Sequence, residues 1–141
     1  MSRINAGRVV LGGLLAGLVI NLIDFVVNVP ILGARWSQYS RALGVDESKV
    51  GTGSALGWIA SDFIFAILLV WLYAAIRPRF GPGPRTAVLA SVVVWFISHV
   101  AYYAFVFMGL YPMDMILCSA LGALIACLAG GQLGCWLYRE A

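Results

Sequence analysis

The sequence predicts an all-α fold, an antiparallel four-helix transmembrane bundle with a short interfacial helix in its first outer loop. The first reason is composition: 62% of the residues are hydrophobic, 11% are charged, and the mean hydropathy is +0.96. Soluble domains are about a quarter charged, so a chain this apolar must place much of its surface in lipid. The second reason is that the apolar residues fall into long segments. The third is that the basic residues gather in the connections between them.

The apolar residues form four segments, each long enough to cross a bilayer. A helix needs about 20 apolar residues to cross a hydrocarbon core of ~30 Å. The first segment is too long for a signal peptide, and no small-residue cleavage site follows it, so we interpret it as a retained helix. The whole chain, residues 1–141, is expected to form one integral membrane domain. Its predicted spans are residues 9–32, 57–76, 86–108 and 115–137.

The first connection, residues 33–56, is the longest. Trp36, Tyr39 and Leu43 fall at helical spacing with polar residues between them. This pattern predicts a short amphipathic helix lying in the membrane interface, and Gly44 is expected to end it.

The remaining loop segments are rich in glycine, proline or arginine. Residues 51–54 predict a flexible lead into the second span. Residues 77–85 predict a stiff, basic turn, and residues 109–114 predict a tight turn.

The distribution of basic residues predicts the topology. Lysine and arginine in short loops favour the cytoplasmic side. Six arginines fall at the two termini and in the second connection, against three basic residues on the other side, so both termini are predicted to be cytoplasmic. The six are Arg3, Arg8, Arg77, Arg79, Arg85 and Arg139; the three are Arg35, Arg41 and Lys49, which share their side with Asp46, Glu47 and Asp114.

Three ionisable residues, Asp24, Asp62 and His99, lie well inside the predicted spans. At a rise of 1.5 Å per residue they are ~12, ~8 and ~14 Å from the outer ends of their helices, so they share one depth. Ionisable groups in hydrocarbon are costly and usually face the bundle interior, where they mark pathways for protons, ions or substrates. The sequence therefore predicts one polar site in the outer half of the membrane.

Neighbouring polar residues extend this predicted site. In the first span, Asn21, Asp24 and Asn28 follow i, i+3, i+7 spacing and so line one face of the helix. The alternative is structural, because polar side chains also join membrane helices through hydrogen bonds worth ~0.6 kcal/mol. A lone histidine lacks the partners that a metal site needs, so no metal and no cofactor are predicted. The complete predicted site is Asn21, Asp24, Asn28, Ser61, Asp62, Ser98, His99, Tyr102 and Tyr103.

Small residues form ridges on the first and fourth predicted helices. Such ridges allow the backbones of neighbouring membrane helices to approach closely. One ridge is expected to serve packing within the bundle and the other a contact between subunits. The residues are Gly13 and Gly17 in the first helix, and Gly122, Ala126, Gly130 and Gly134 in the fourth.

A short repeat is visible at the ends of two spans. Residues 71–73 and 136–138 both read Trp–Leu–Tyr, and arginine soon follows each. Duplication of a helical hairpin would produce this repeat. The ordinary gathering of aromatic residues at span ends would produce it as well.

The first outer corner carries a family resemblance. Residues 28–44, with Pro30, the Gly–Ala–Arg–Trp sequence at 33–36 and the Arg–Ala–Leu–Gly sequence at 41–44, resemble small four-span bacterial membrane proteins of uncharacterised function. The resemblance implies a bacterial inner membrane, and it implies no particular activity.

The predicted function is transport or permeation of a proton, a cation or a small solute, carried out by an oligomer. The alternative is a non-catalytic, accessory subunit of a larger membrane complex. The sequence has no hydrolase, metalloprotease or nucleotide-binding motif, which disfavours an enzyme, and an enzyme acting on a lipid or quinone is the third hypothesis. The expected partners are the lipid bilayer and either further copies of the chain or a larger complex, with no nucleic acid.

Overall fold

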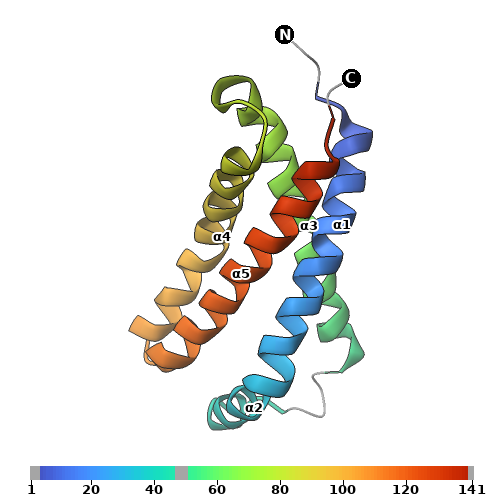
Figure 1. The fold of residues 1–141 in the computed structure, drawn as a ribbon. Helices are drawn as coiled ribbons and strands as arrows, with labels where there is room; N and C mark the ends of the chain where they lie inside the picture. The colour runs from blue at the N-terminus through green and yellow to red at the C-terminus, as the bar shows by residue number, and fades with distance from the viewer. Residues whose placement is uncertain (1–3, 47–50, 140–141) are drawn as a thin grey trace.

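The computed structural model describes residues 4–46 and 51–139, apart from the side chain of Thr52, and this part of the chain is helical without any strand (Figure 1). Four of the helices are long and apolar enough to cross a membrane, as a multi-pass membrane protein requires. The all-α class and its four long apolar helices are thus confirmed. The elements are α1 (Ala6–Val26), the π-helical turn η1 (Val27–Ile31), α2 (Gly33–Ala42), α3 (Thr52–Phe80), α4 (Pro84–Phe107) and α5 (Met113–Leu137).

Two predicted loop segments are partly helical. Helix α3 begins at Thr52, so the flexible lead predicted at 51–54 is wrong. The same helix continues through Pro78, although proline removes one helical hydrogen bond. It ends where the Gly81 N–H donates to the Arg77 oxygen at 2.9 Å and Gly81 adopts a φ of 83°. The basic turn predicted to start at Arg77 is therefore shorter than expected. Among the charged residues used for topology, Arg3, Glu47 and Lys49 lie outside the described residues.

Helix α1 gives way to a wider turn before it reaches α2. In η1 the Leu32 N–H donates to the Val27 oxygen, five residues back, at 3.0 Å. Pro30 lies in this turn and has no N–H, so the regular α-helical ladder cannot continue through it. Single π turns of this kind interrupt α-helices, frequently at functional sites.

The ridge of small residues on α5 packs against α1. A Cβ atom on Gly130 would lie 2.7 Å from the Ala16 backbone oxygen, and one on Gly134 would lie 2.6 Å from the Gly12 oxygen. Only glycine allows the two backbones to come this close. All four ridge residues, Gly122, Ala126, Gly130 and Gly134, are buried.

The ridge on α1 packs against α3. A Cβ atom on Gly13 would meet Ile67 at 2.5 Å, and one on Gly17 would collide with the ring of Phe63. Both ridges therefore lie inside the bundle. Neither is left for the contact between subunits that the sequence suggested.

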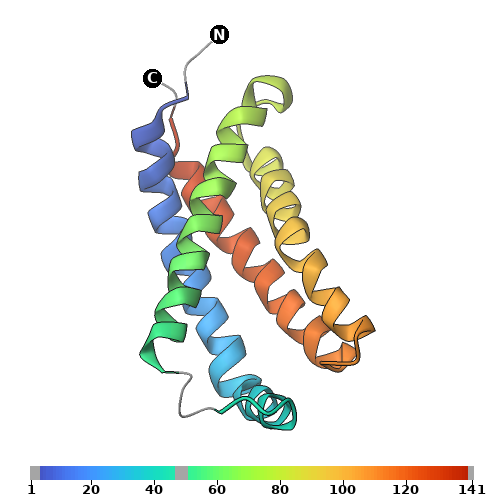
Figure 2. The same ribbon diagram turned by 180° about the vertical axis from the view of Figure 1, so that it is seen from behind.

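Helices α3 and α4 pack closely at one end and diverge toward the other (Figures 1 and 2). The buried residues of α4 all lie near its start, at Thr86, Ala87, Ala90 and Ser91. The turn between α3 and α4, the beginning of α1 and the end of α5 meet at the closed end (Figure 1). We call it the arginine-rich end, after its described arginines Arg8, Arg77, Arg79, Arg85 and Arg139. The opposite end, which carries α2, is the α2 end.

The Trp–Leu–Tyr repeats place two tyrosines in matching positions. Tyr73 and Tyr138 are buried and pack edge to face, with ring centroids 6.1 Å apart. Each hydroxyl accepts a hydrogen bond from the backbone just before a helix. Tyr73 accepts from the Gly83 N–H at 3.2 Å, before α4, and Tyr138 accepts from the Asn5 N–H at 3.3 Å, before α1. Each tyrosine at the end of one helical hairpin therefore contacts the backbone at the start of the other.

Candidate functional site

The structure brings together ionisable residues from three helices. Asp24 of α1 lies near enough for its charge to affect Asp62 of α3 and His99 of α4, although no hydrogen bond or ion pair in the described part of the chain joins the three side chains. Tyr102, one turn beyond His99, interacts with both carboxylates. All four side chains are half-buried. Asp62 lies on the part of α3, and His99 and Tyr102 on the part of α4, where these two helices diverge, so the polar site belongs to the less tightly packed half of the bundle.

Asp24 is held by a hydrogen-bonded neighbour in the π turn that directly follows its helix. The Asn28 side-chain amide donates to Asp24 Oδ1 at 2.9 Å. The amide oxygen of Asn28 accepts from Trp36 Nε1 at 3.1 Å and from Ser119 Oγ at 3.2 Å. Asn28 lies in η1, Trp36 in α2 and Ser119 in α5. One asparagine therefore connects the Asp24 carboxylate to two further elements of the fold.

His99 is fixed through one of its ring nitrogens. Nδ1 lies 3.0 Å from the Trp95 backbone oxygen and 2.9 Å from Ser98 Oγ. A carbonyl oxygen only accepts, so this geometry favours a proton on Nδ1 and leaves Nε2 with a lone pair. The imidazole also stacks between the rings of Trp95 and Tyr102, at centroid distances of 5.9 and 5.7 Å. His99 is thus oriented as a proton acceptor.

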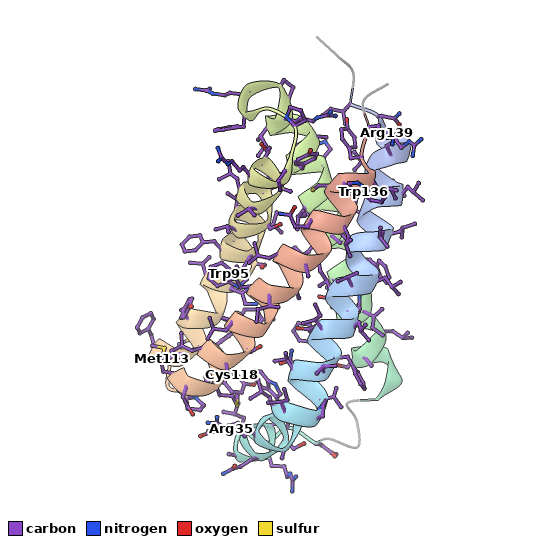
Figure 3. All side chains as sticks on the ribbon, in the orientation of Figure 1. Arg35, Trp95, Met113, Cys118, Trp136 and Arg139 are labelled. Atoms are coloured by element: carbon purple, nitrogen blue, oxygen red, sulfur yellow. The ribbon has the colours of Figure 1, made fainter. Side chains whose placement is uncertain are left out.

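Trp95 anchors this part of α4 to α5. Its indole Nε1 donates to the Ala120 backbone oxygen at 2.8 Å, and its side chain lies near the middle of α4 (Figure 3). Trp95 is not among the site residues predicted from the sequence. Its position one helical turn before His99 is the signal that could have identified it.

Asp62 differs from Asp24 in its surroundings. Within residues 4–46 and 51–139, its carboxylate makes no hydrogen bond, and its charged neighbour is Asp24. Two neighbouring carboxylates repel one another when both are ionised. The repulsion is relieved when the pair shares a proton or when a cation binds between them.

The other predicted site residues are less closely connected to this pair. Asn21 donates to the backbone oxygens of Gly17 at 2.9 Å and Ile59 at 3.4 Å, which joins α1 to α3. Ser61 donates at 2.9 Å to a backbone oxygen one turn earlier in α3. Tyr103 is half-buried, and no hydrogen bond or ring contact in the described part of the chain connects it to the site. The connected core is Asp24, Asn28, Asp62, His99 and Tyr102.

An unbroken series of aromatic rings extends from His99 to the α2 end. Tyr102 contacts Phe105, Phe105 contacts Tyr111, and Tyr111 contacts Trp36, with centroid distances of 6.0, 6.4 and 5.3 Å. The series ends at the same Trp36 that donates to Asn28. The polar site and α2 are therefore connected by two routes, one aromatic and one hydrogen-bonded.

An ion pair also fastens α2 to the beginning of α5. Arg35 donates to Asp114 at 2.8 Å, and this bond raises the pKa of the guanidinium above its usual value. The side chains are 39% and 69% exposed, so the pair adds little stability of its own. Its effect is to position α2 over the turn between α4 and α5.

The chemistry available at the site is that of carboxylates, an imidazole and a phenol. In the described ranges, no group of three or more histidine, cysteine, aspartate or glutamate residues could hold a metal ion. The groups present can bind, release and transfer protons, and the carboxylates can attract a cation. Comparisons with protein-family models, with curated proteins and with solved structures find no match to this chain.

Proposed function

We propose that the protein is a small transporter or permeation protein that moves a proton, a cation or a small solute through the Asp24, Asp62 and His99 site. The observation that carries the proposal is that two carboxylates from different helices, Asp24 and Asp62, lie near enough for the charge of one to affect the other. No lysine or arginine of the described chain is among the charged groups that act on either one. With His99 as the basic group beside Asp24, the two carboxylates limit their repulsion by sharing a proton, by interacting with His99 or by binding a mobile cation.

The surrounding groups give each carboxylate a separate role in this proposal. Asn28 holds Asp24 in place, so Asp24 is the fixed member. Asp62 makes no hydrogen bond in the described chain, so it is the member that meets the transported species. The lone pair on His99 Nε2 and the Tyr102 hydroxyl supply a proton acceptor and a donor beside them. The divergence of α3 and α4 supports access from the α2 end (Figure 2).

The arrangement in the membrane is part of the proposal. We infer an antiparallel bundle in a bacterial inner membrane, with cytoplasmic termini and with α2 lying in the outer interface. The order of the α1–α5 contacts supports the antiparallel part, because Gly134 meets Gly12 while Gly130 meets Ala16. The five arginines at the closed end support the orientation. A bundle of this size has a thin wall, so the pathway is proposed to form in a homo-oligomer or a larger complex within the bilayer.

The second candidate is a non-catalytic accessory subunit. The hydrogen bonds of Asn28 favour it, because they join α2 and α5 to the helix that carries Asp24. In that role the polar groups only hold the helices together.

A flux measurement separates the two candidates. Purified protein is reconstituted into vesicles, and uptake of protons and of monovalent cations is compared with that of empty vesicles. The double variant Asp24→Asn and Asp62→Asn should lose the flux while keeping a helical, monodisperse fold, because carboxamides preserve the shape but carry no exchangeable charge. Wild-type vesicles that are no more permeable than empty ones would overturn the transport proposal in favour of the accessory role.

The orientation is tested by labelling cysteines in intact cells, in a Cys118→Ser background, because Cys118 is exposed. Gln38→Cys in α2 should react with a membrane-impermeant maleimide added outside, because α2 is proposed to lie there. Pro82→Cys, in the turn at the arginine-rich end, should react only after the membrane is opened. Both positions are exposed, so access alone separates them. The reverse pattern would show that the orientation is inverted.

A further inference from the structure

A groove lies between α4 and α5 at the arginine-rich end, apart from the polar site. It has a volume of about 570 Å³, within the range of ~300–1,000 Å³ typical of ligand sites. Pro84 and Ala87 of α4 line one side, and Gln132, Leu133 and Trp136 of α5 line the other. The Gln132 amide donates to the Pro84 oxygen at 3.1 Å, which fixes the two sides relative to each other.

The groove opens on an exposed, largely apolar face of the two helices. Leu133 is 46% exposed and Trp136 is 77% exposed, although both lie on a helix long and apolar enough to cross a membrane. Trp136 is near the end of α5, one turn from Arg139 (Figure 3). Tryptophan with an exposed ring at this position is typical of the boundary between acyl chains and headgroups.

Two arginines lie near the lining of the groove at this end. Arg85 directly follows Pro84 and is exposed. Arg77 lies over the Tyr138 ring, 5.7 Å from its centroid, and Tyr138 contacts the groove residue Tyr73. The described residues of this end include no aspartate or glutamate, and Arg3 and Glu140 are outside the described part of the chain. The end is therefore complementary to a negatively charged group.

We propose that this groove binds an anionic phospholipid, with an acyl chain between α4 and α5 and the phosphate at Arg85. The apolar groove suits the acyl chain of such a lipid, and the arginine beside the groove suits its phosphate. A free phosphate would leave the apolar groove empty, and a zwitterionic lipid would carry an added positive charge toward the arginines. The bound lipid would bridge α4 and α5 at the arginine-rich end, where α3 also packs against α4.

The experiment uses the full chain in an uncharged detergent. Native mass spectrometry and thermal melting are followed as phosphatidylglycerol, phosphatidylcholine with the same acyl chains, or inorganic phosphate is added. Phosphatidylglycerol should form a discrete complex and raise the melting temperature, and the other two additives should have much smaller effects. Arg85→Gln should remove most of the difference between the two lipids.

Two matched controls locate the binding. Arg8→Gln removes the same charge at the same end, on a helix that contributes nothing to the groove, and should keep the lipid preference. Leu133→Trp fills the groove and should weaken the binding of both lipids. Leu121→Trp, at an exposed position elsewhere on α5, should leave the binding of both lipids unchanged.

Three results would overturn the proposal. Equal binding of phosphatidylglycerol and phosphatidylcholine would show that the arginine beside the groove does not favour an anionic headgroup. An equal shift with inorganic phosphate would show that no acyl chain is needed. If Arg85→Gln and Arg8→Gln reduced the preference for phosphatidylglycerol equally, the lipid would be attracted by the charge of the whole arginine-rich end and not by a site at Arg85. None of these measurements depends on flux, so the lipid site and the transport proposal can fail separately.

Discussion

Replacing Gly130 with leucine is expected to lower the free energy of unfolding by about 1–3 kcal/mol or more, the range found when side chains are forced into a packed interface. Even a Cβ atom at this position would lie 2.7 Å from the Ala16 oxygen and 2.9 Å from Ile20 Cγ1. The first of these is a backbone atom, so α1 and α5 must separate to make room. A large fall in the melting temperature of the detergent-solubilised protein is the expected result.

Gly57→Leu is the matched control for this variant. Gly57 is also within a long apolar helix, but a Cβ atom there would meet nothing within 4 Å. Leucine at this exposed position should leave the melting temperature unchanged or raise it, because leucine favours a helix over glycine by up to ~1 kcal/mol. Equal melting temperatures for the two variants would show that α1 and α5 are not in close contact in the folded protein.

Asp24→Asn is expected to reduce uptake into reconstituted vesicles to the level of empty ones. The substitution removes the exchangeable charge but keeps an oxygen that can accept from Asn28, as Asp24 Oδ1 does at 2.9 Å. The change in stability should therefore be small, about the ~0.6 kcal/mol of a typical hydrogen bond between membrane helices. Flux and thermal melting measured on the same preparation give both quantities.

The control is Asp114→Asn, the same chemical change at a side chain that is 69% exposed. It should retain flux, because Asp114 pairs with Arg35 and is not part of the Asp24 and Asp62 pair. If Asp24→Asn fails to fold, Asp62→Asn takes its place, since Asp62 has no hydrogen bond in the described chain to lose. Wild-type flux in a folded Asp24→Asn or Asp62→Asn variant would contradict the proposed pathway.

The four long helices were predictable because lipid leaves the backbone few alternatives. A segment in hydrocarbon must satisfy its own N–H and C=O groups, and long apolar runs therefore become helices. Their ends were less predictable because this constraint is weaker in water. Pro78 indicated a loop, yet α3 runs through it to a hydrogen bond between Gly81 and Arg77. Likewise, the ridges of small residues indicated close packing, but only the fold shows that Gly130 meets α1 and Gly13 meets α3.

Within the polar site, only the residues with the highest free-energy cost in lipid could be predicted from the sequence. Asp24, Asp62 and His99 stand out in apolar segments because ionisable groups there are costly. Ser119 and Trp36 do not stand out in the sequence, because a hydroxyl or an indole is tolerated at many positions in a membrane helix or its interface. Ser119 reaches Asn28 across 91 residues of sequence. Such a contact is set by the packing of α5 against η1, which no local pattern reveals.

The π turn at Val27–Ile31 makes chain length itself a determinant of the site. A π turn amounts to one residue inserted into an α-helix. Deleting one residue within it would restore the regular helix, rotating everything that follows by about 100° and shifting it by ~1.5 Å. Trp36 would then leave Asn28, and Arg35 would leave Asp114, although every contacting side chain would still be present. The number of residues between Asp24 and α2 is thus as constrained as their identity.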